Sequence, residues 1–377
     1  MPNIYSRMKL LPKFILAILL LTAASVSIAS DWYVTPSYIK NLQSGWTLYG
    51  RTKTVKPSEN KIQLKKSIDE TLQLKLERHA LGNNKIMILA AGNTIIAEKY
   101  NVSKNISPAG NSMSKSVLSL LVGQVFCSGA ISSLNDKVEN YVSALKGTNW
   151  GESSIENLLT MSSGAYYAPS TLMGQKNKEM QKEMSGAIFG NTTPSISSIL
   201  KKHDEKKFKP GKQFIYSNAD TSALGLVLRN ATNKPIHVLS QRLWNEVGAN
   251  KKATWLVNSR GETMSYMGFA ASPNDWILLG HYVNQRLRGD DCFADYLKAA
   301  TTTQIANSAF SDNRDYGYQI WTECEVGSGA FCFVGALGQL LMIEPEKELV
   351  LYIHSTNKNW GGMNHWGTYL WAAYQNK

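Results

Sequence analysis

Short apolar runs with the spacing of β-strands lie near both ends of the chain. The run KIMILAAGNTIIAEKY (85–100) contains two such runs joined by Ala91-Gly92-Asn93, which predicts a hairpin. Towards the other end, turn residues separate four more runs that predict strands: 316–321, 330–334, 339–344 and 348–355.

The chain between these strands has mainly helical spacing. Apolar positions predict helices over 154–161, 221–232 and 273–287, with further helices over 64–79 and 364–375. Strands at both ends with helices between them predict an α+β fold: one antiparallel sheet built from both chain ends, flanked by helices, with a mostly helical domain inserted at about 110–300. A site would then lie between the sheet and that helical part.

The first residues have the pattern of an export signal. Basic residues precede FILAILLLTAASVSIA, a mostly apolar run that ends in the small-x-small sequence Ser27-Ile28-Ala29. A membrane span needs roughly 20 apolar residues, so a cleaved signal is favoured over an uncleaved anchor. We expect a signal peptide over 1–29, an extended N-terminal arm over 30–60 and the folded domain over 61–377. The mature protein would be periplasmic or secreted, without stable membrane insertion.

Composition and charge narrow the classes of partner. Hydrophobic residues make up 43% of the chain, which is enough for a large core. The net charge is +12, but much of it lies in 176–184 and 201–212, where acidic residues are interspersed. Such mixed runs are typical of a solvated face. The sequence has no zinc-finger spacing and no basic groove interleaved with aromatic residues, so a nucleic-acid partner is not expected.

The four cysteines allow three full pairings. Cys324 and Cys332 lie at either end of a short segment between two predicted strands, where a disulfide would close a hairpin in an oxidising compartment. Pairing of Cys127 with Cys292 is less favoured, because sequence does not fix connectivity. None of the four lies in a C-x-x-C motif, so no metal site is predicted.

The pattern Ser-x-x-Lys occurs seven times, and its context selects one occurrence. Only Ser112 and Lys115 precede a long apolar run, 117–126, which predicts a helix buried on nearly every side. Residues i and i+3 share a helix face, so the amine of Lys115 would lie near the hydroxyl of Ser112. Burial would lower the pKa of Lys115 and suit it to proton transfer. The alternative is that Ser112 only caps the helix.

Two further elements have candidate chemistry. Tyr216-Ser217-Asn218 follows a Pro-Gly turn and precedes a helix, which places the tyrosine in a loop. Phe333-Val334-Gly335-Ala336 ends a predicted strand, where a glycine lets a ligand approach and the next amide can donate to an oxyanion. A bulged hairpin is the alternative. An α/β-hydrolase elbow around Ser112 is disfavoured, because no strand is predicted before it.

Taken in order, these three elements resemble the motifs of the serine β-lactamase and penicillin-binding-protein superfamily. The similarity lies in the branch with class C β-lactamases, family VIII-type esterases and 6-aminohexanoate-dimer hydrolases, and it covers roughly residues 85–355. It implies a β-lactamase/transpeptidase-like fold, an acyl-enzyme mechanism and no cofactor.

The resemblance also implies roles for individual residues. Ser112 matches the nucleophile, Lys115 the proton acceptor, Tyr216 the group that relays a proton to the leaving group, and Asn218 the residue that orients the substrate amide. The oxyanion donors would be the backbone amides of Ser112 and Ala336, the latter next to Gly335. Two tyrosines in a segment expected to overhang the site would contact substrate or pack as part of that lid: Tyr166 and Tyr167.

The chain departs from the family at the third motif. β-Lactamases and D,D-peptidases usually have Lys-Thr-Gly there, whereas this chain has Phe333 and Val334 before the glycine. A small ester or linear amide is therefore the expected substrate. The alternatives are a β-lactamase or D,D-peptidase acting on peptidoglycan and, from another class, a non-catalytic sensor or binding protein. The sequence predicts neither the natural substrate nor the oligomeric state.

Overall fold

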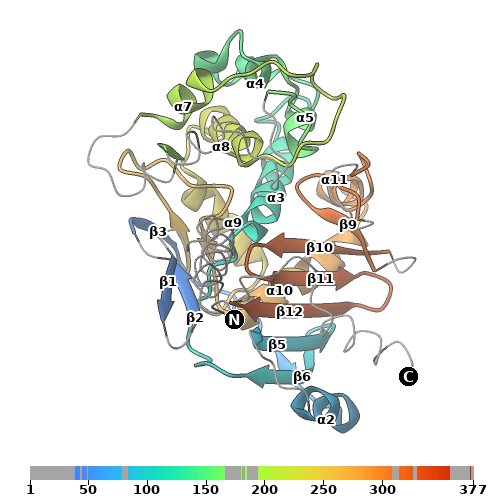
Figure 1. Ribbon diagram of the computed structural model, residues 1–377. Coiled ribbons are helices and arrows are strands. Elements are labelled where there is room, and N and C mark those ends of the chain that lie inside the picture. Colours follow the sequence, from blue (N-terminus) through green and yellow to red (C-terminus); the bar gives the residue numbers. More distant parts are fainter. Residues whose placement is uncertain are drawn as a thin grey trace, which may run out of the picture. The chain divides into compact units, whose positions relative to one another are not determined.

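Strands from the two ends of the chain lie side by side in the main sheet of the computed structural model (Figure 1). The structure describes residues 39–42, 45–48, 50–78, 84–165, 180, 183–184, 194–307, 314–325, 329–356 and 374. The main sheet has seven strands in the order β4-β6-β5-β12-β11-β10-β9. Their bounds are β4 Lys65–Lys66, β5 Asn84–Ala91, β6 Thr94–Tyr100, β9 Trp321–Glu325, β10 Ala330–Gly335, β11 Gln339–Glu344 and β12 Leu349–Ser355.

The pairing of β5 with β12 joins the two chain ends. These strands are antiparallel, with Leu349 opposite Ala91 and Leu351 opposite Leu89. All neighbouring strands of this sheet are antiparallel except β4 and β6. Every residue of β11 and β12 is buried, which explains why their sequences are almost continuously apolar rather than alternating. The predicted α+β fold with a sheet built from both ends is confirmed.

The helices occupy mainly the segment between β6 and β9. The described helices are α2 Glu70–Arg78, α3 Met113–Cys127, α4 Asn149–Glu152, α5 Ile155–Leu159, α7 Ile196–Lys202, α8 Asn218–Thr232, α9 Ile236–Glu246, α10 Pro273–Leu287 and α11 Cys292–Ala300. Two short 3₁₀ helices are η2 Val138–Asn140 and η3 Ser143–Leu145. The helix predicted over 273–287 matches α10, whose start is fixed by the Ser272 cap and a proline in the first turn.

Part of the predicted N-terminal arm forms short β-strands, which the sequence did not predict. Strand β1 (Ile39–Leu42) pairs with β2 (Gly45–Leu48), and β3 (Thr52–Val55) joins β7 (Ala253–Leu256) and β8 (Phe269–Ala270) in a three-stranded sheet. Four-residue strands are too short to show a period of two, and the partner of β3 lies far downstream in sequence. Residues 1–38 lie outside the described residues, so the signal peptide over 1–29 stays a prediction.

Two other predicted boundaries were wrong. The segment 316–321 is a bend rather than a strand as far as Ile320, and β9 begins only at Trp321. The backbone of Gln319 has a φ of 58°, which is incompatible with extended structure. The helix predicted over 64–79 begins at Glu70, because residues 65–66 pair with β6 instead. Of the helix predicted over 364–375, only Tyr374 is among the described residues.

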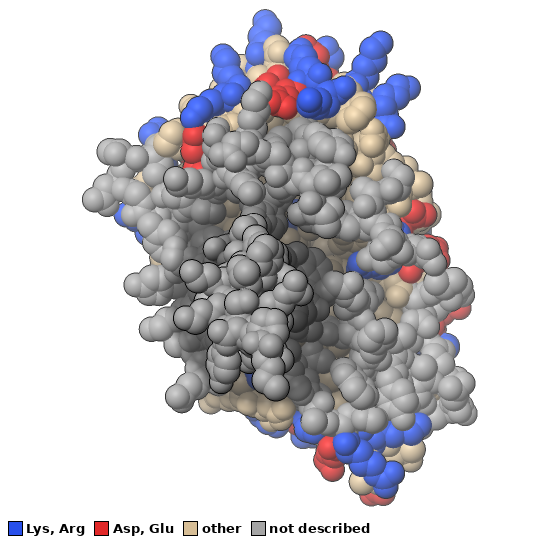
Figure 2. All heavy atoms as spheres, viewed as in Figure 1, with Lys and Arg blue, Asp and Glu red and all other residues tan. Residues whose placement is uncertain are grey.

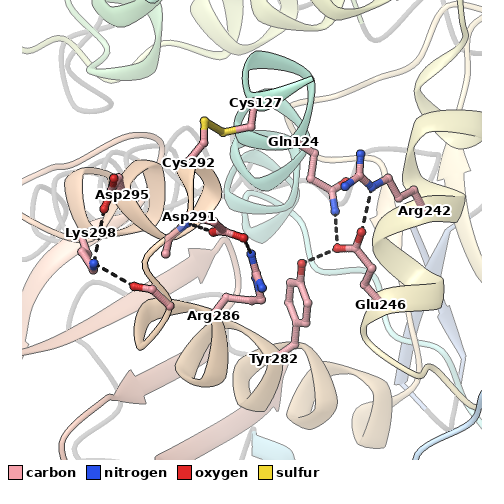
Figure 3. A network of polar contacts seen from close by, with 12 residues as sticks. Gln124, Cys127, Arg242, Glu246, Tyr282, Arg286, Asp291, Cys292, Asp295 and Lys298 are labelled. Carbon is pink, nitrogen blue, oxygen red and sulfur yellow. Dashed lines mark hydrogen bonds and ion pairs between the residues drawn. A yellow bond between two sulfur atoms is a disulfide. The ribbon is translucent and has the colours of Figure 1, made fainter. Parts of the chain in front are cut away.

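Both cysteine pairs form disulfides in the structure. Cys324–Cys332 joins β9 to β10 with a Cα–Cα distance of 6.1 Å. The less favoured pair, Cys127–Cys292, is also bonded, with a Cα–Cα distance of 5.7 Å across 165 residues of sequence. It joins the end of α3 to the start of α11 (Figure 3). A partner so distant in sequence leaves no local signal, which is why this pairing was the less favoured one.

Polar contacts with α9 and α10 also hold the C-terminal end of α3. Glu246 accepts hydrogen bonds from Gln124 Nε2 at 2.8 Å and from the Tyr282 hydroxyl at 2.6 Å, and it pairs with Arg242 (Figure 3). Residues 113–125 of α3 are buried, as the sequence predicts. The helix that begins next to Ser112 is thus fixed at its far end by a covalent bond and by α9 and α10.

Candidate active site

The chain turns sharply into α3 just before Ser112. Gly110 N donates to Phe269 O at 2.9 Å, and Asn111 has a left-handed backbone with a φ of 50°. Ser112 occupies the N-cap position, but its side chain makes no capping hydrogen bond. The suggestion that Ser112 caps its helix was therefore wrong. Ser114 satisfies this turn instead, donating its hydroxyl to Asn111 O at 2.6 Å.

Lys115 lies one helical turn from Ser112 and is 1% exposed. Its Nζ lies 3.2 Å from Ser112 Oγ, 2.7 Å from Asn218 Oδ1 and 2.9 Å from the Tyr266 carbonyl oxygen. Burial holds the pKa of this amine well below its ordinary value. A neutral amine has two N–H groups and one lone pair. The Asn218 and Tyr266 oxygens can only accept, so in the neutral form the two N–H groups would donate to them and the lone pair would be left for the Ser112 hydroxyl.

Tyr216 lies in the irregular segment before α8 and approaches the same pair. Its ring centre is 5.0 Å from Lys115 Nζ, and its ring stacks on Trp321 with centroids 5.5 Å apart. Burial raises the pKa of Tyr216 to about 12, although a hydrogen bond with Ser112 and the charge of Arg314 act in the opposite direction. The phenol is therefore protonated near neutral pH and can donate a hydrogen bond or a proton.

The third motif lies at the end of β10, directly against the turn that precedes Ser112. A Cβ atom at Gly335 would lie 2.2 Å from Gly110 O, so only glycine permits this approach. The next residue, Ala336, has its carbonyl oxygen 2.8 Å from Asn111 Nδ2. The structure therefore brings all three sequence motifs together, and Ser112, Tyr216, Asn218 and Ala336 are each partly exposed there.

The two residues before Gly335 are apolar and pack into the protein interior. Phe333 is fully buried. Val334 is partly buried and packs against the core cluster that includes Trp321 and, at its edge, Tyr216. The side chains at these two positions therefore offer neither a cation nor a hydroxyl to a substrate.

Sequence reasoning missed two contributors to this arrangement. Tyr266 acts through its backbone carbonyl, for which no side-chain pattern gives a signal. Asn111 directly precedes the predicted nucleophile, but its contact with Ala336 spans 225 residues of sequence. Tyr166 and Tyr167 lie outside the described residues, so their placement relative to Ser112 stays a prediction.

The charged surface lies apart from these motifs. Figure 2 shows Lys and Arg mixed with Asp and Glu at the top of the view, above the helical part. Lys202 pairs with Glu183, and Lys206 pairs with Glu152 at 2.7 Å, with the lysine side chains largely exposed. This is the solvated face that the mixed run predicts.

Among the described residues there is no group of three metal-ligating side chains. None of the described helices is long and apolar enough to span a bilayer.

Comparison with known proteins defines the class. A family model described as Beta-lactamase matches residues 108–375, a range that contains all three motifs. The chain therefore belongs to the beta-lactamase family, and it is a serine hydrolase. No curated protein matches it in sequence.

Solved structures show the same fold at low sequence identity. A protein assigned as a 6-aminohexanoate-dimer hydrolase from Bacillus anthracis has a TM-score of 0.71 and 16% identity, covering 87% of this chain and 90% of its own. An octameric penicillin-binding protein homologue from Pyrococcus abyssi has a TM-score of 0.63 and 15% identity, covering 82% and 77%. A D-stereospecific amidohydrolase from Streptomyces has a TM-score of 0.60 and 14% identity, covering 80% and 97%.

Proposed function

We propose that the protein is an exported hydrolase that cleaves a small ester or linear amide through an acyl-enzyme on Ser112. The observation that carries this proposal is the orientation of Lys115. Two acceptor-only oxygens hold its amine 3.2 Å from Ser112 Oγ, and burial lowers its pKa, which favours the neutral form whose lone pair can accept the Ser112 proton. A buried lysine whose only task was structural would not need to face a partly exposed serine.

The proposed reaction follows from these contacts. Ser112 Oγ attacks the substrate carbonyl carbon while its proton moves to Lys115 Nζ, and the carbonyl oxygen becomes an oxyanion held by the backbone amides of Ser112 and Ala336. The tetrahedral intermediate collapses, and the bond to the leaving group breaks as Tyr216 delivers a proton to it. The Lys115 ammonium returns that proton to Tyr216. Water then attacks the acyl-enzyme and restores Ser112.

Phe333 and Val334 support the choice of substrate class. A β-lactam carries a carboxylate, and without a charge-assisted partner that group loses about 1.5–3 kcal/mol of interaction. The absence of a cation and a hydroxyl at these two positions instead suits a substrate without that carboxylate. Names among the structural neighbours, an amidohydrolase and a 6-aminohexanoate-dimer hydrolase, agree with an amide or ester substrate.

Export is supported by two independent features. The N-terminal sequence has the signal pattern, and all four cysteines are paired in the structure. Disulfides of this kind persist in oxidising compartments and are rare in the cytosol. Detection of the mature N-terminus near residue 30 in a periplasmic or culture fraction would test this part of the proposal.

Intact-mass analysis after treatment with a fluorophosphonate tests catalysis directly. We expect one adduct on the wild type and none on Ser112→Ala. The matched control is Ser143→Ala, which removes the exposed serine of another Ser-x-x-Lys sequence, at the start of η3. This variant should label fully. Absence of an adduct on the wild type, or an adduct that survives Ser112→Ala, would favour the non-catalytic alternative.

Substrate class needs a separate comparison. Turnover of a chromogenic cephalosporin and of a short-chain nitrophenyl ester should be measured on the same preparation. We expect kcat/KM to favour the ester, and efficient cephalosporin hydrolysis would refute the interpretation of Phe333 and Val334.

A further inference from the structure

Asn111, the residue before the nucleophile, joins the two sides of the proposed oxyanion hole. Its backbone leads directly into the Ser112 amide, and its side-chain Nδ2 donates to the carbonyl oxygen of Ala336 at 2.8 Å. The residue is 3% exposed, so this hydrogen bond is shielded from water. The side chain of Asn111 therefore links the peptide before Ser112, which supplies one proposed donor, to Ala336, which supplies the other.

The backbone at this position restricts which residues can serve. A φ of 50° is left-handed, a conformation that glycine and asparagine adopt most readily. Glycine would fit the backbone but has no side-chain donor. Aspartate is the closest in shape, yet as a carboxylate it can only accept, and it would oppose the Ala336 carbonyl. Asparagine meets both requirements.

The oxygen of the Asn111 side-chain amide indicates that a gain in folding free energy is a poor explanation for this residue. Asn111 Oδ1 is buried and has no hydrogen-bond partner among the residues that the structure describes. A buried acceptor without a partner is destabilising, by about as much as one hydrogen bond contributes or more. The side chain is therefore explained better by what its Nδ2 positions than by a net gain in folding free energy.

The turn that carries Ala336 is anchored from the opposite side as well. Leu337 and Gly338 both have left-handed backbones, with φ of 67° and 83°. Gln339 follows them, and its Nε2 donates to Ser355 O at 2.6 Å while its Oε1 lies 2.6 Å from His354 Nδ1. The turn is thus fixed to β12 by Gln339 and to the start of α3 by Asn111.

We propose that Asn111 is a positioning residue that sets the separation of the two oxyanion donors. This inference rests on the proposed function, because it takes the amides of Ser112 and Ala336 as those donors. An oxyanion is stabilised fully only when both amides reach it together, and a displacement of about 1 Å can lower a rate by about a hundredfold. Without the Asn111 contact, the turn would lose its side-chain hydrogen bond to the segment that begins α3.

The test compares Asn111→Gly with a matched control, Asn233→Gly. Asn233 is exposed at the end of α8 and has a φ of 54°, so the same substitution is made in the same backbone conformation away from the site. For Asn111→Gly we expect kcat on the nitrophenyl ester to fall about 10- to 100-fold, with KM within about twofold. Asn111→Asp should lose at least as much, and Asn233→Gly should keep wild-type kcat.

Fluorophosphonate labelling separates positioning from loss of folded protein. The final stoichiometry of the adduct counts competent sites, whereas its rate of formation depends on the oxyanion donors. We expect Asn111→Gly to reach wild-type stoichiometry at a rate reduced in proportion to kcat. A wild-type kcat in Asn111→Gly, or a fall explained entirely by lower stoichiometry, would overturn the inference. Failure of the proposed function would appear differently, as absence of labelling on wild-type Ser112.

Discussion

Removal of the Cys127–Cys292 disulfide should destabilise the protein more than removal of Cys324–Cys332. The first bond spans 165 residues and the second spans 8. Loop-closure entropy grows with the logarithm of the loop, which gives about 5 kcal/mol for the long loop and about 2.5 kcal/mol for the short one at 25 °C. For a domain of this size the difference corresponds to about 4 °C in the melting temperature.

The assay compares two double variants, Cys127→Ala/Cys292→Ala and Cys324→Ala/Cys332→Ala, by thermal unfolding at one pH. Ester turnover at 25 °C should stay within about twofold of wild type for the first variant, because Gln124 and Tyr282 still fasten the end of α3 through Glu246. An equal or smaller loss of stability than in the second variant would refute the loop-length reasoning.

Two predictions concern the site itself. The pKa of Lys115 lies well below 10.5, so kcat/KM should rise with pH as this amine loses its proton and level off before pH 10.5; a rate that climbs through that pH would contradict the assignment. Lys115→Arg, which cannot act as a base, should lower kcat by about 10²–10⁴ at every pH. Gly335→Ala should destabilise the fold by about 1–3 kcal/mol and slow ester hydrolysis, since its Cβ would meet Gly110 O; a denaturation curve and kcat equal to wild type would disprove that close approach.

Prediction from sequence succeeded where the signal was local. The hairpin of β5 and β6 was predicted because its turn residues and both apolar runs are adjacent in sequence, and the observed turn has Gly92 with a φ of 55°. The buried helix α3 was predicted for the same reason, since its apolar residues cover every face. In both cases the residues that predict the element lie within the element itself.

Prediction failed where a partner decides the structure. Strand β3 has only four residues and exists through its pairing with β7, so its own sequence does not reveal it. The Cys127–Cys292 disulfide, which the sequence favoured less, and the Asn111–Ala336 contact are similar, since each joins segments more than a hundred residues apart. Sequence reasoning recovered part of the site only because the resemblance supplied the long-range pairing of its three motifs.

The Ser-x-x-Lys spacing by itself brings the lysine amine near the serine hydroxyl but does not set the orientation of that amine. The orientation of the Lys115 amine is set by Asn218 and Tyr266, which lie 103 and 151 residues further along the chain and supply its two acceptors. Without either of them, Lys115 would remain buried with a lowered pKa, yet its lone pair could turn towards the vacated position. The pKa of the base and its direction are thus set by different parts of the fold, and only the first follows from the sequence of α3.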